Sequence, residues 1–107
     1  MWVVLGAPLD SAAEGEGEER APEALRSAGL VERLGARDMG DVAEPLRPPD
    51  RDKRTGILAF ESLVEASTAI AEAVKGALHS GDRPLVLGGD CSLLIGAIAG
   101  ARDAAQR

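Results

Sequence analysis

The residues best suited to chemistry lie in one short turn, Gly88-Gly89-Asp90-Cys91-Ser92, between two apolar runs. Paired glycines let a backbone turn sharply and approach a ligand closely. Asp90 or Ser92 can cap the helix that is expected to follow, and Cys91 lies between them at its start. A thiol at the start of a helix could act as a nucleophile. The alternative is a purely structural tight turn with a half-buried cysteine.

A second turn with polar side chains follows the N-terminal apolar run and spans Gly6 to Ser11. Ligands of open α/β sheets bind beyond the carboxyl ends of the strands, where both turns are expected to lie. The candidates for contact with a cationic substrate are Asp10, Ser11, Glu18 and Glu19. An acidic lip over such a site would attract cations. The more ordinary interpretation is a solvated loop, whose acids also include Glu14 and Glu16.

Three strand-and-helix units can position these turns. The predicted strands cover residues 3–5, 36–42 and 84–87. Asp38 and Asp41 favour an edge position for the second strand. A helix is predicted from Pro22 to Gly35, because proline suits a first helical turn, although Gly29 weakens it by about 1 kcal/mol. The apolar residues that this helix would turn toward the core are Leu25, Leu30, Val31 and Leu34.

The longest predicted helix begins near Phe60, after a polar, proline-broken linker at residues 45–55, and ends at Gly81. Its hydrophobic periodicity predicts an amphipathic helix of about 22 residues packed on a sheet. Residues on its apolar side are Phe60, Leu63, Val64, Ile70, Ala71, Val74, Ala77 and Leu78. A further flank consists of the small residues Ala66, Ala69 and Ala73.

The last strand and helix are apolar almost throughout. Residues 84–87 form a continuous apolar run, which is typical of a parallel strand buried on both faces. Residues 93–101 predict a helix with few polar positions. Gly96 and Gly100 give it a flat strip for close packing against another element. The rest of this helix needs cover on more than one side, which three strands do not readily provide.

Composition excludes several classes of function. The chain has 107 residues, a net charge of −6 and 45% hydrophobic residues, which favours one globular domain. Trp2 and Phe60 are the only aromatic residues, so base stacking and binding to a phosphate backbone are not expected. Cys91 is the only cysteine and cannot form an intramolecular disulfide. With no signal-like N-terminus and no apolar run long enough to span a bilayer, we expect a cytoplasmic protein that binds neither nucleic acid nor membrane.

The segment from Val86 to Gly96, which contains the Gly88–Ser92 turn, resembles the Gly-Gly-Asp-His-Ser segment of the arginase/agmatinase (ureohydrolase) family. Residues 5–11 resemble the first strand and turn of that family, and residues 17–30 its glycine-rich loop and first helix. Residues 38–41 resemble the Asp-x-Gly-Asp of its second strand. The resemblance implies a three-layer α/β/α domain with a parallel sheet, of which residues 1–107 form the N-terminal part with the first three strand-and-helix units. The implied strand order is second, first, third.

The same resemblance implies a hydrolase that cleaves C–N bonds of small guanidino or amidine compounds. Complete family members hold a pair of manganese ions, whose bridging hydroxide is the nucleophile. Most of their ligands come from later Asp-x-His-x-Asp and Asp-x-Asp motifs. Cys91 stands at the position of the histidine ligand in the Gly-Gly-Asp-His-Ser turn, and is the one metal-ligand candidate here.

The sequence departs from the family pattern in two respects. A thiolate at Cys91 is a poor ligand for manganese, which prefers oxygen and imidazole. The chain ends at Arg107 without an Asp-x-His-x-Asp motif, and His79 is its only histidine. We therefore expect this chain alone to bind manganese poorly and to be inactive. Asp50-Arg51-Asp52 spells Asp-x-Asp but lies in the linker, where we expect solvated side chains.

Three other functions compete with this interpretation. The chain could be a non-catalytic interaction module or a truncated relic of the fold, forming a homo-oligomer or binding a missing C-terminal portion through its apolar last helix. It could use Cys91 as the nucleophile of a thiol hydrolase, but His79 is expected at the opposite edge of the sheet, too far to act as a base. A dinucleotide-binding function is disfavoured because neither glycine turn has the Gly-x-Gly-x-x-Gly pattern.

Overall fold

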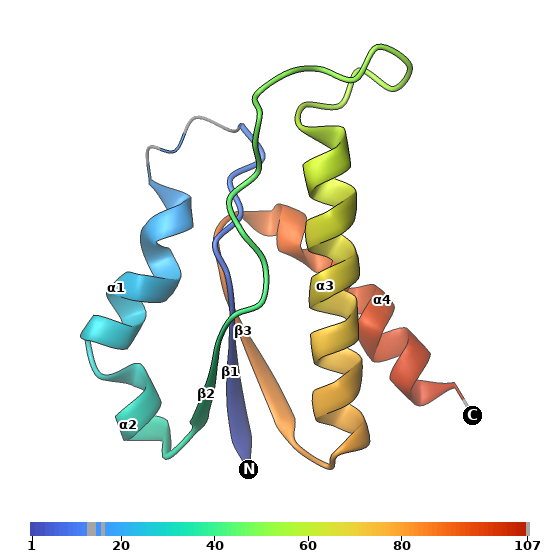
Figure 1. The fold of residues 1–107 in the computed structure, drawn as a ribbon. Helices are drawn as coiled ribbons and strands as arrows, with labels where there is room; N and C mark the ends of the chain where they lie inside the picture. The colour runs from blue at the N-terminus through green and yellow to red at the C-terminus, as the bar shows by residue number, and fades with distance from the viewer. Residues whose placement is uncertain (13–14, 16, 107) are drawn as a thin grey trace.

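The computed structural model describes residues 1–12, 15 and 17–106; Glu14 and Glu16 of the acidic loop lie outside the described residues. The strands are β1 (Trp2–Ala7), β2 (Arg37–Asp41) and β3 (Arg83–Gly88). The helices are α1 (Ala21–Ser27), α2 (Leu30–Leu34), α3 (Phe60–His79) and α4 (Leu94–Ala105), with short 3-10 turns at η1 (Glu18–Arg20) and η2 (Cys91–Leu93). Figure 1 shows these elements along the chain.

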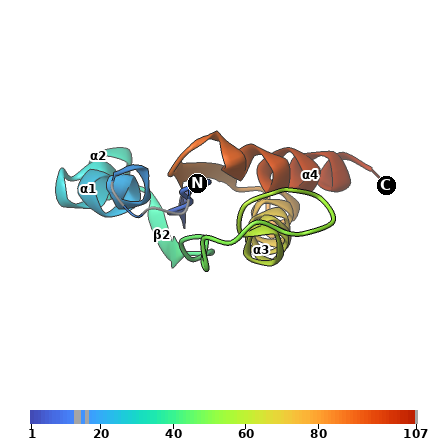
Figure 2. The same cartoon turned by 90° about the horizontal axis from the view of Figure 1, so that it is seen from above.

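The three strands form one parallel sheet in the order β2-β1-β3, as predicted. The central strand β1 is buried along most of its length, because it is apolar and has a neighbour on each side. Its Leu5 and Ala7 face α3, where they join a core with Ile70 and Val74. Gly6 faces the other way, toward Arg26 of α1. Helices therefore cover both faces of the sheet, and in Figure 2 α1 and α3 lie on opposite sides of it.

The helix predicted from Pro22 to Gly35 is divided into α1 and α2. Gly29 adopts a left-handed conformation with φ +91°, which ends α1 and redirects the chain. The expectation that Leu25 and Leu34 belong to the core is wrong, because both are exposed after this change of direction. Without a single helix axis, their sequence spacing no longer places them on one face.

Helix α3 has 20 residues, close to the predicted length, and buries Ala66, Ile70 and Val74. Val64 and Leu78, which were assigned to its apolar side, are exposed. The reason is that α3 packs against two elements, the sheet on one flank and α4 on another. The close contacts of Gly96 and Gly100 of α4 lie at Ser67 and Ala71, between Val64 and Leu78 in the sequence of α3.

The predicted flat strip of α4 is confirmed. Gly96 and Gly100 are buried, and a Cβ on either would overlap the backbone carbonyl of Ser67 or Ala71. This close approach fixes α4 against α3, beyond the outer edge of β3 (Figure 2). The expectation that β3 is buried on both faces is wrong for most of the strand, because only Leu87 is fully buried. In the described residues, β3 pairs with β1 alone.

The segment between β2 and α3 is less solvated than its composition suggests. Leu46 is fully buried within this polar, proline-rich stretch, and Ala43 and Ala59 join it in the core. Asp50 and Asp52 stay in the loop as expected, with the carboxylate of Asp52 accepting a hydrogen bond from the Thr55 N–H. Across the part of the chain that the structure describes, no helix has the length and apolarity needed to cross a bilayer.

Candidate functional site at the carboxyl ends of the strands

The turns that follow β1 and β3 meet at the carboxyl edge of the sheet, where Asp90 joins them. One carboxylate oxygen, Oδ2, accepts hydrogen bonds from the N–H and the hydroxyl of Ser11, both at 2.6 Å. The other, Oδ1, accepts from the N–H and hydroxyl of Ser92, at 3.1 and 2.5 Å. The Asp90 N–H also donates to the Leu9 carbonyl at 2.9 Å. We call this arrangement of Ser11, Asp90 and Ser92 the Asp90 clasp.

The clasp keeps Asp90 ionised. Partial burial by itself raises the pKa of this carboxyl, but the hydrogen bonds from Ser11 and Ser92 oppose it and leave the pKa below its ordinary value. An ionised carboxylate is the form that accepts from all of these donors. The clasp therefore fixes the β1 and β3 turns relative to each other at neutral pH.

The two glycines of the β3 turn have different surroundings. A Cβ on Gly88 would overlap only Cδ2 at the end of the Leu93 side chain, which can shift. Gly89 has φ +44°, and a Cβ there would lie 2.5 Å from the N and O atoms of Leu9. The close approach of these glycines to a ligand stays a prediction; in this structure the group that Gly89 approaches is the β1 turn.

Cys91 is the first residue of η2 and is exposed, immediately after the carboxyl end of β3. Its role as a metal ligand stays a prediction that the resemblance implies. No group of three or more His, Cys, Asp or Glu side chains that could hold a metal ion occurs among residues 1–12, 15 and 17–106. His79 is the last residue of α3, and Figure 1 shows that α3 ends near the amino ends of the strands. Cys91 follows the carboxyl end of β3, so the structure does not bring the two residues together.

The four substrate-loop candidates lie in different surroundings. Ser11 belongs to the Asp90 clasp. Asp10 is buried, and its carboxylate accepts from the N–H groups of Ala12 and Gly15 at 3.1 and 2.8 Å. Glu18 is exposed in η1, and the Glu19 carboxylate accepts from the Gly17 N–H at 2.6 Å. Asp10 and Glu19 thus help to shape their own loop, and their role toward a substrate stays a prediction.

The Asp-x-Gly-Asp segment of β2 binds α1 through ion pairs. Arg26 of α1 forms ion pairs with Asp38 at 2.9 Å and Asp41 at 2.7 Å. The Gly40 N–H also donates to Asp38, and this bond with the Arg26 pair holds the pKa of Asp38 below its ordinary value. The absence of a side chain at Gly6 makes room for this ion-pair cluster, because a Cβ there would overlap the Asp41 carboxylate. Sequence reasoning assigned these acids to an edge strand but missed their partner.

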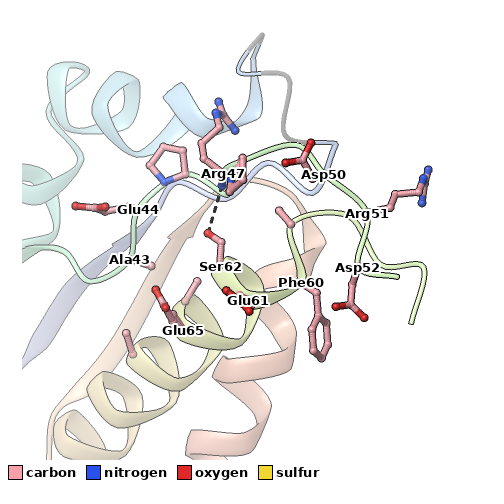
Figure 3. A pocket seen from close by; sticks show the side chains of 15 residues that line it. Ala43, Glu44, Arg47, Asp50, Arg51, Asp52, Phe60, Glu61, Ser62 and Glu65 are labelled. Carbon is pink, nitrogen blue, oxygen red and sulfur yellow. Dashed lines mark hydrogen bonds between the residues drawn. The ribbon is translucent and has the colours of Figure 1, made fainter. Parts of the chain in front are cut away.

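A separate cleft of about 1000 Å³ lies between the loop after β2 and the first turns of α3. Glu61, Ser62 and Glu65 line it from α3, below the loop that carries Arg47 and Asp50 (Figure 3). The Arg47 N–H donates to the Ser62 hydroxyl at 3.3 Å. None of its lining residues belongs to the Asp90 clasp or to the turn at Gly88–Ser92, so sequence reasoning about strand ends did not find this cleft.

Comparison with known proteins places this geometry in a family. The arginase of Bacillus caldovelox is 34% identical over 105 residues, and human mitochondrial Arginase-2 is 36% identical over 102 residues. These matches cover 91% of this chain but 34% and 29% of the relatives. The crystal structure of the Bacillus caldovelox arginase superposes with a TM-score of 0.81 and 33% identity, over 95% of this chain and 36% of that one.

The chain thus spans about a third of the length of the curated relatives that it matches. The model of the Arginase family matches residues 1–107, the whole sequence. The structural match covers the parallel β2-β1-β3 sheet and its helices. This chain belongs to the arginase family.

Proposed function

We propose that residues 1–107 supply the N-terminal part of a single arginase-like domain, in a hydrolase that cleaves C–N bonds of a small guanidino or amidine compound. The observation that carries the proposal is the turn at Gly88–Ser92, held by Asp90 at the carboxyl edge of a parallel sheet. Ligands of open α/β sheets bind at this edge. The named relatives that share this segment are arginases.

The residues present do not fit a pair of manganese ions by themselves. Cys91 is the one candidate ligand that the family pattern assigns here, and the described residues contain no cluster that could complete a metal site. Thiolate also suits zinc or iron better than manganese. This chain's own residues position the two turns: the Asp90 clasp fixes the β1 and β3 turns relative to each other, and Cys91 is exposed next to Asp90.

The first experiment measures manganese and urea for the chain alone. We expect less than one manganese per chain after gel filtration, by elemental analysis, and no urea from arginine or agmatine above the protein-free rate. The Cys91→His variant should behave in the same way, because one imidazole replaces only one ligand. The arginase of Bacillus caldovelox is the positive control. Retention of a full equivalent of manganese by the chain alone would contradict this expectation.

The second experiment tests the hydrolase function itself. Residues 1–107 replace the matched segment of the Bacillus caldovelox arginase, and urea release is measured with Cys91 and with Cys91→His. If this turn serves a manganese hydrolase, the histidine chimera should release urea at least tenfold faster than the cysteine chimera, since imidazole is the better manganese ligand. A matched variant, Cys91→Ser, should not gain activity. Equal rates for all three would count against a role for this turn in metal chemistry.

A non-catalytic interaction module is the second candidate. The specific observation in its favour is the exposed apolar side of α4, which carries Leu94, Ile95 and Ile98. Binding of a partner without any turnover, in the presence and absence of manganese, would favour this function. We place either form of the protein in the cytoplasm as a proposal, which cell fractionation tests.

A further inference from the structure

The cleft between the loop after β2 and the first turns of α3, which we call the α3 cleft, is large enough for a small molecule (Figure 3). Its volume of about 1000 Å³ lies at the upper end of the range of about 300–1000 Å³ that is typical of ligand pockets. Three of its lining residues, Ala43, Ala59 and Ala66, are buried and form an apolar floor. Their small side chains leave the space between the loop and the helix open.

The structure holds the loop wall of the α3 cleft in place. Leu46 anchors the loop because its side chain is fully buried in the core. The Arg47 N–H donates to the Ser62 hydroxyl of α3 at 3.3 Å. Further along the loop, the Ala59 N–H donates to the Asp50 carbonyl at 2.8 Å. These contacts fix the loop relative to α3, so the cleft is already formed, as most small-molecule sites are.

The charge on the lining of the α3 cleft is unbalanced. Its carboxylates belong to Glu44, Asp50, Asp52, Glu61 and Glu65, and its guanidinium groups to Arg47 and Arg51. Both arginines are engaged elsewhere, because Arg47 donates to the Leu46 carbonyl and Arg51 to the Gly56 carbonyl at 2.9 Å. Among the residues that the structure describes, the ion pairs include none of these lining side chains. The cleft therefore has an excess of negative charge, which attracts cations.

The positions of the carboxylates favour an extended organic cation over a metal ion. Across residues 1–12, 15 and 17–106, no three acidic, cysteine or histidine side chains converge on a point that could hold a metal. Instead, Glu61 and Glu65 line the cleft one helical turn apart (Figure 3), a spacing that places their Cβ atoms about 5–6 Å from each other. Two ammonium groups joined by a short aliphatic chain have a comparable separation. The methylene groups between them match the apolar alanine floor.

We propose that the α3 cleft is a binding site for a linear aliphatic polyamine. Its ammonium groups lie at the carboxylates of Glu61 and Glu65, and its methylene groups lie against Ala59 and Ala66. None of the lining residues belongs to the Asp90 clasp or to the turn at Gly88–Ser92. This binding therefore requires neither a metal ion nor the proposed hydrolase function.

The test is an NMR titration of the isotope-labelled chain with spermidine, in about 0.15 M salt to screen non-specific attraction. We expect saturable one-to-one binding, with the largest amide shifts in residues 59–69. n-Butylamine, which has a single ammonium group, should bind about tenfold more weakly. Glu61→Gln combined with Glu65→Gln should weaken spermidine binding about fivefold or more. The matched control combines Glu32→Gln with Glu72→Gln, which removes the same charge outside the cleft and should leave the affinity unchanged.

Three results would overturn the proposal. Equal weakening by the two double variants would show that binding follows net charge alone. Displacement of spermidine by an equal concentration of magnesium chloride would indicate a metal site. Tighter binding of a peptide of alternating alanine and lysine would indicate a protein partner. If residues 1–107 aggregate, the same titration uses the chimera with the Bacillus caldovelox arginase. A chimera that binds spermidine but releases no urea would reject only the proposed hydrolase function.

Discussion

The two edges of the sheet are built from different chemistry. At one edge, β2 is short and charged, and Arg26 of α1 pairs with its Asp38 and Asp41. At the other edge, β3 is almost entirely apolar after Arg83 and leads into the exposed apolar side of α4. Natural sheets protect true edges with charges and short strands. β2 therefore has the composition of an edge strand, whereas β3 has the composition of an interior strand.

The largest loss of stability is expected for a substitution at the contact between α4 and α3, near β3. Alanine for glycine within a helix ordinarily stabilises by up to about 1 kcal/mol. At Gly96 the added Cβ would overlap the Ser67 carbonyl and approach the Ile70 Cβ to 3.0 Å. Gly96→Ala should therefore lower the free energy of unfolding by about 2 kcal/mol, measured by urea denaturation.

Gly76→Ala is the matched control, because Gly76 lies within α3 and a Cβ there would have no neighbour within 4 Å. This variant should raise the free energy of unfolding slightly. If both variants stabilise the protein, α4 is not held against α3 through its glycine strip.

The next effect concerns the turn at the end of β3. Asp90→Asn replaces the carboxylate that accepts hydrogen bonds from Ser11 and Ser92 with a neutral amide, which has a single acceptor oxygen. Hydrogen bonds to charged groups contribute more than neutral ones, so we expect a loss of about 2 kcal/mol at neutral pH in urea denaturation. Asp103→Asn on α4 is the control and should cost less than about 0.5 kcal/mol.

The pH dependence of the same variant follows from linkage. The folded-state pKa of Asp90 is lowered, so its contribution is present above the pKa of the unfolded state and is lost as pH falls through the folded-state pKa. The difference in stability between wild type and Asp90→Asn should therefore shrink in acid. A difference that stays constant from neutral to acid pH would show that the charge of Asp90 does not hold the clasp.

Local patterns were enough to predict the three strands and the packing strip of Gly96 and Gly100, because each depends on residues close in sequence. The strand order was predicted from the family resemblance, since the pairing of β1 with β3 joins residues far apart in the chain. They were not enough for the division at Gly29, which depends on the backbone direction chosen in the folded protein. The burial of Leu46 inside a polar linker likewise depends on contacts with distant core residues.

In the candidate site too, contacts between residues close in sequence could be predicted and contacts between distant residues could not. Asp90 as a cap for the following turn could be predicted, since Ser92 is its neighbour. Its bond to Ser11 spans 79 residues and becomes visible only when β1 and β3 lie side by side. The pairing of Arg26 with Asp38 and Asp41 was missed for the same reason, although an arginine near two edge aspartates was a usable signal.

The smallest loss of stability is expected at the charged edge strand, β2. Arg26→Met removes both ion pairs with β2 while keeping most of the aliphatic stem. Because all three side chains are partly exposed, we expect a loss of about 1 kcal/mol in urea denaturation, which should diminish in 1 M salt. The control Arg33→Met, at an exposed position of α2, should have a smaller effect.

A carboxyl titration by NMR separates the two causes that act on Asp38. In Arg26→Met its pKa should rise toward the ordinary value but remain below it, because the Gly40 N–H still donates to the carboxylate. The contribution of Asp38 to stability is present above its unfolded-state pKa and is lost as pH falls through its lowered folded-state pKa, so the difference in stability between wild type and Arg26→Met should shrink in acid. An unchanged pKa of Asp38 would mean that the backbone alone sets it, and that α1 does not protect the β2 edge electrostatically.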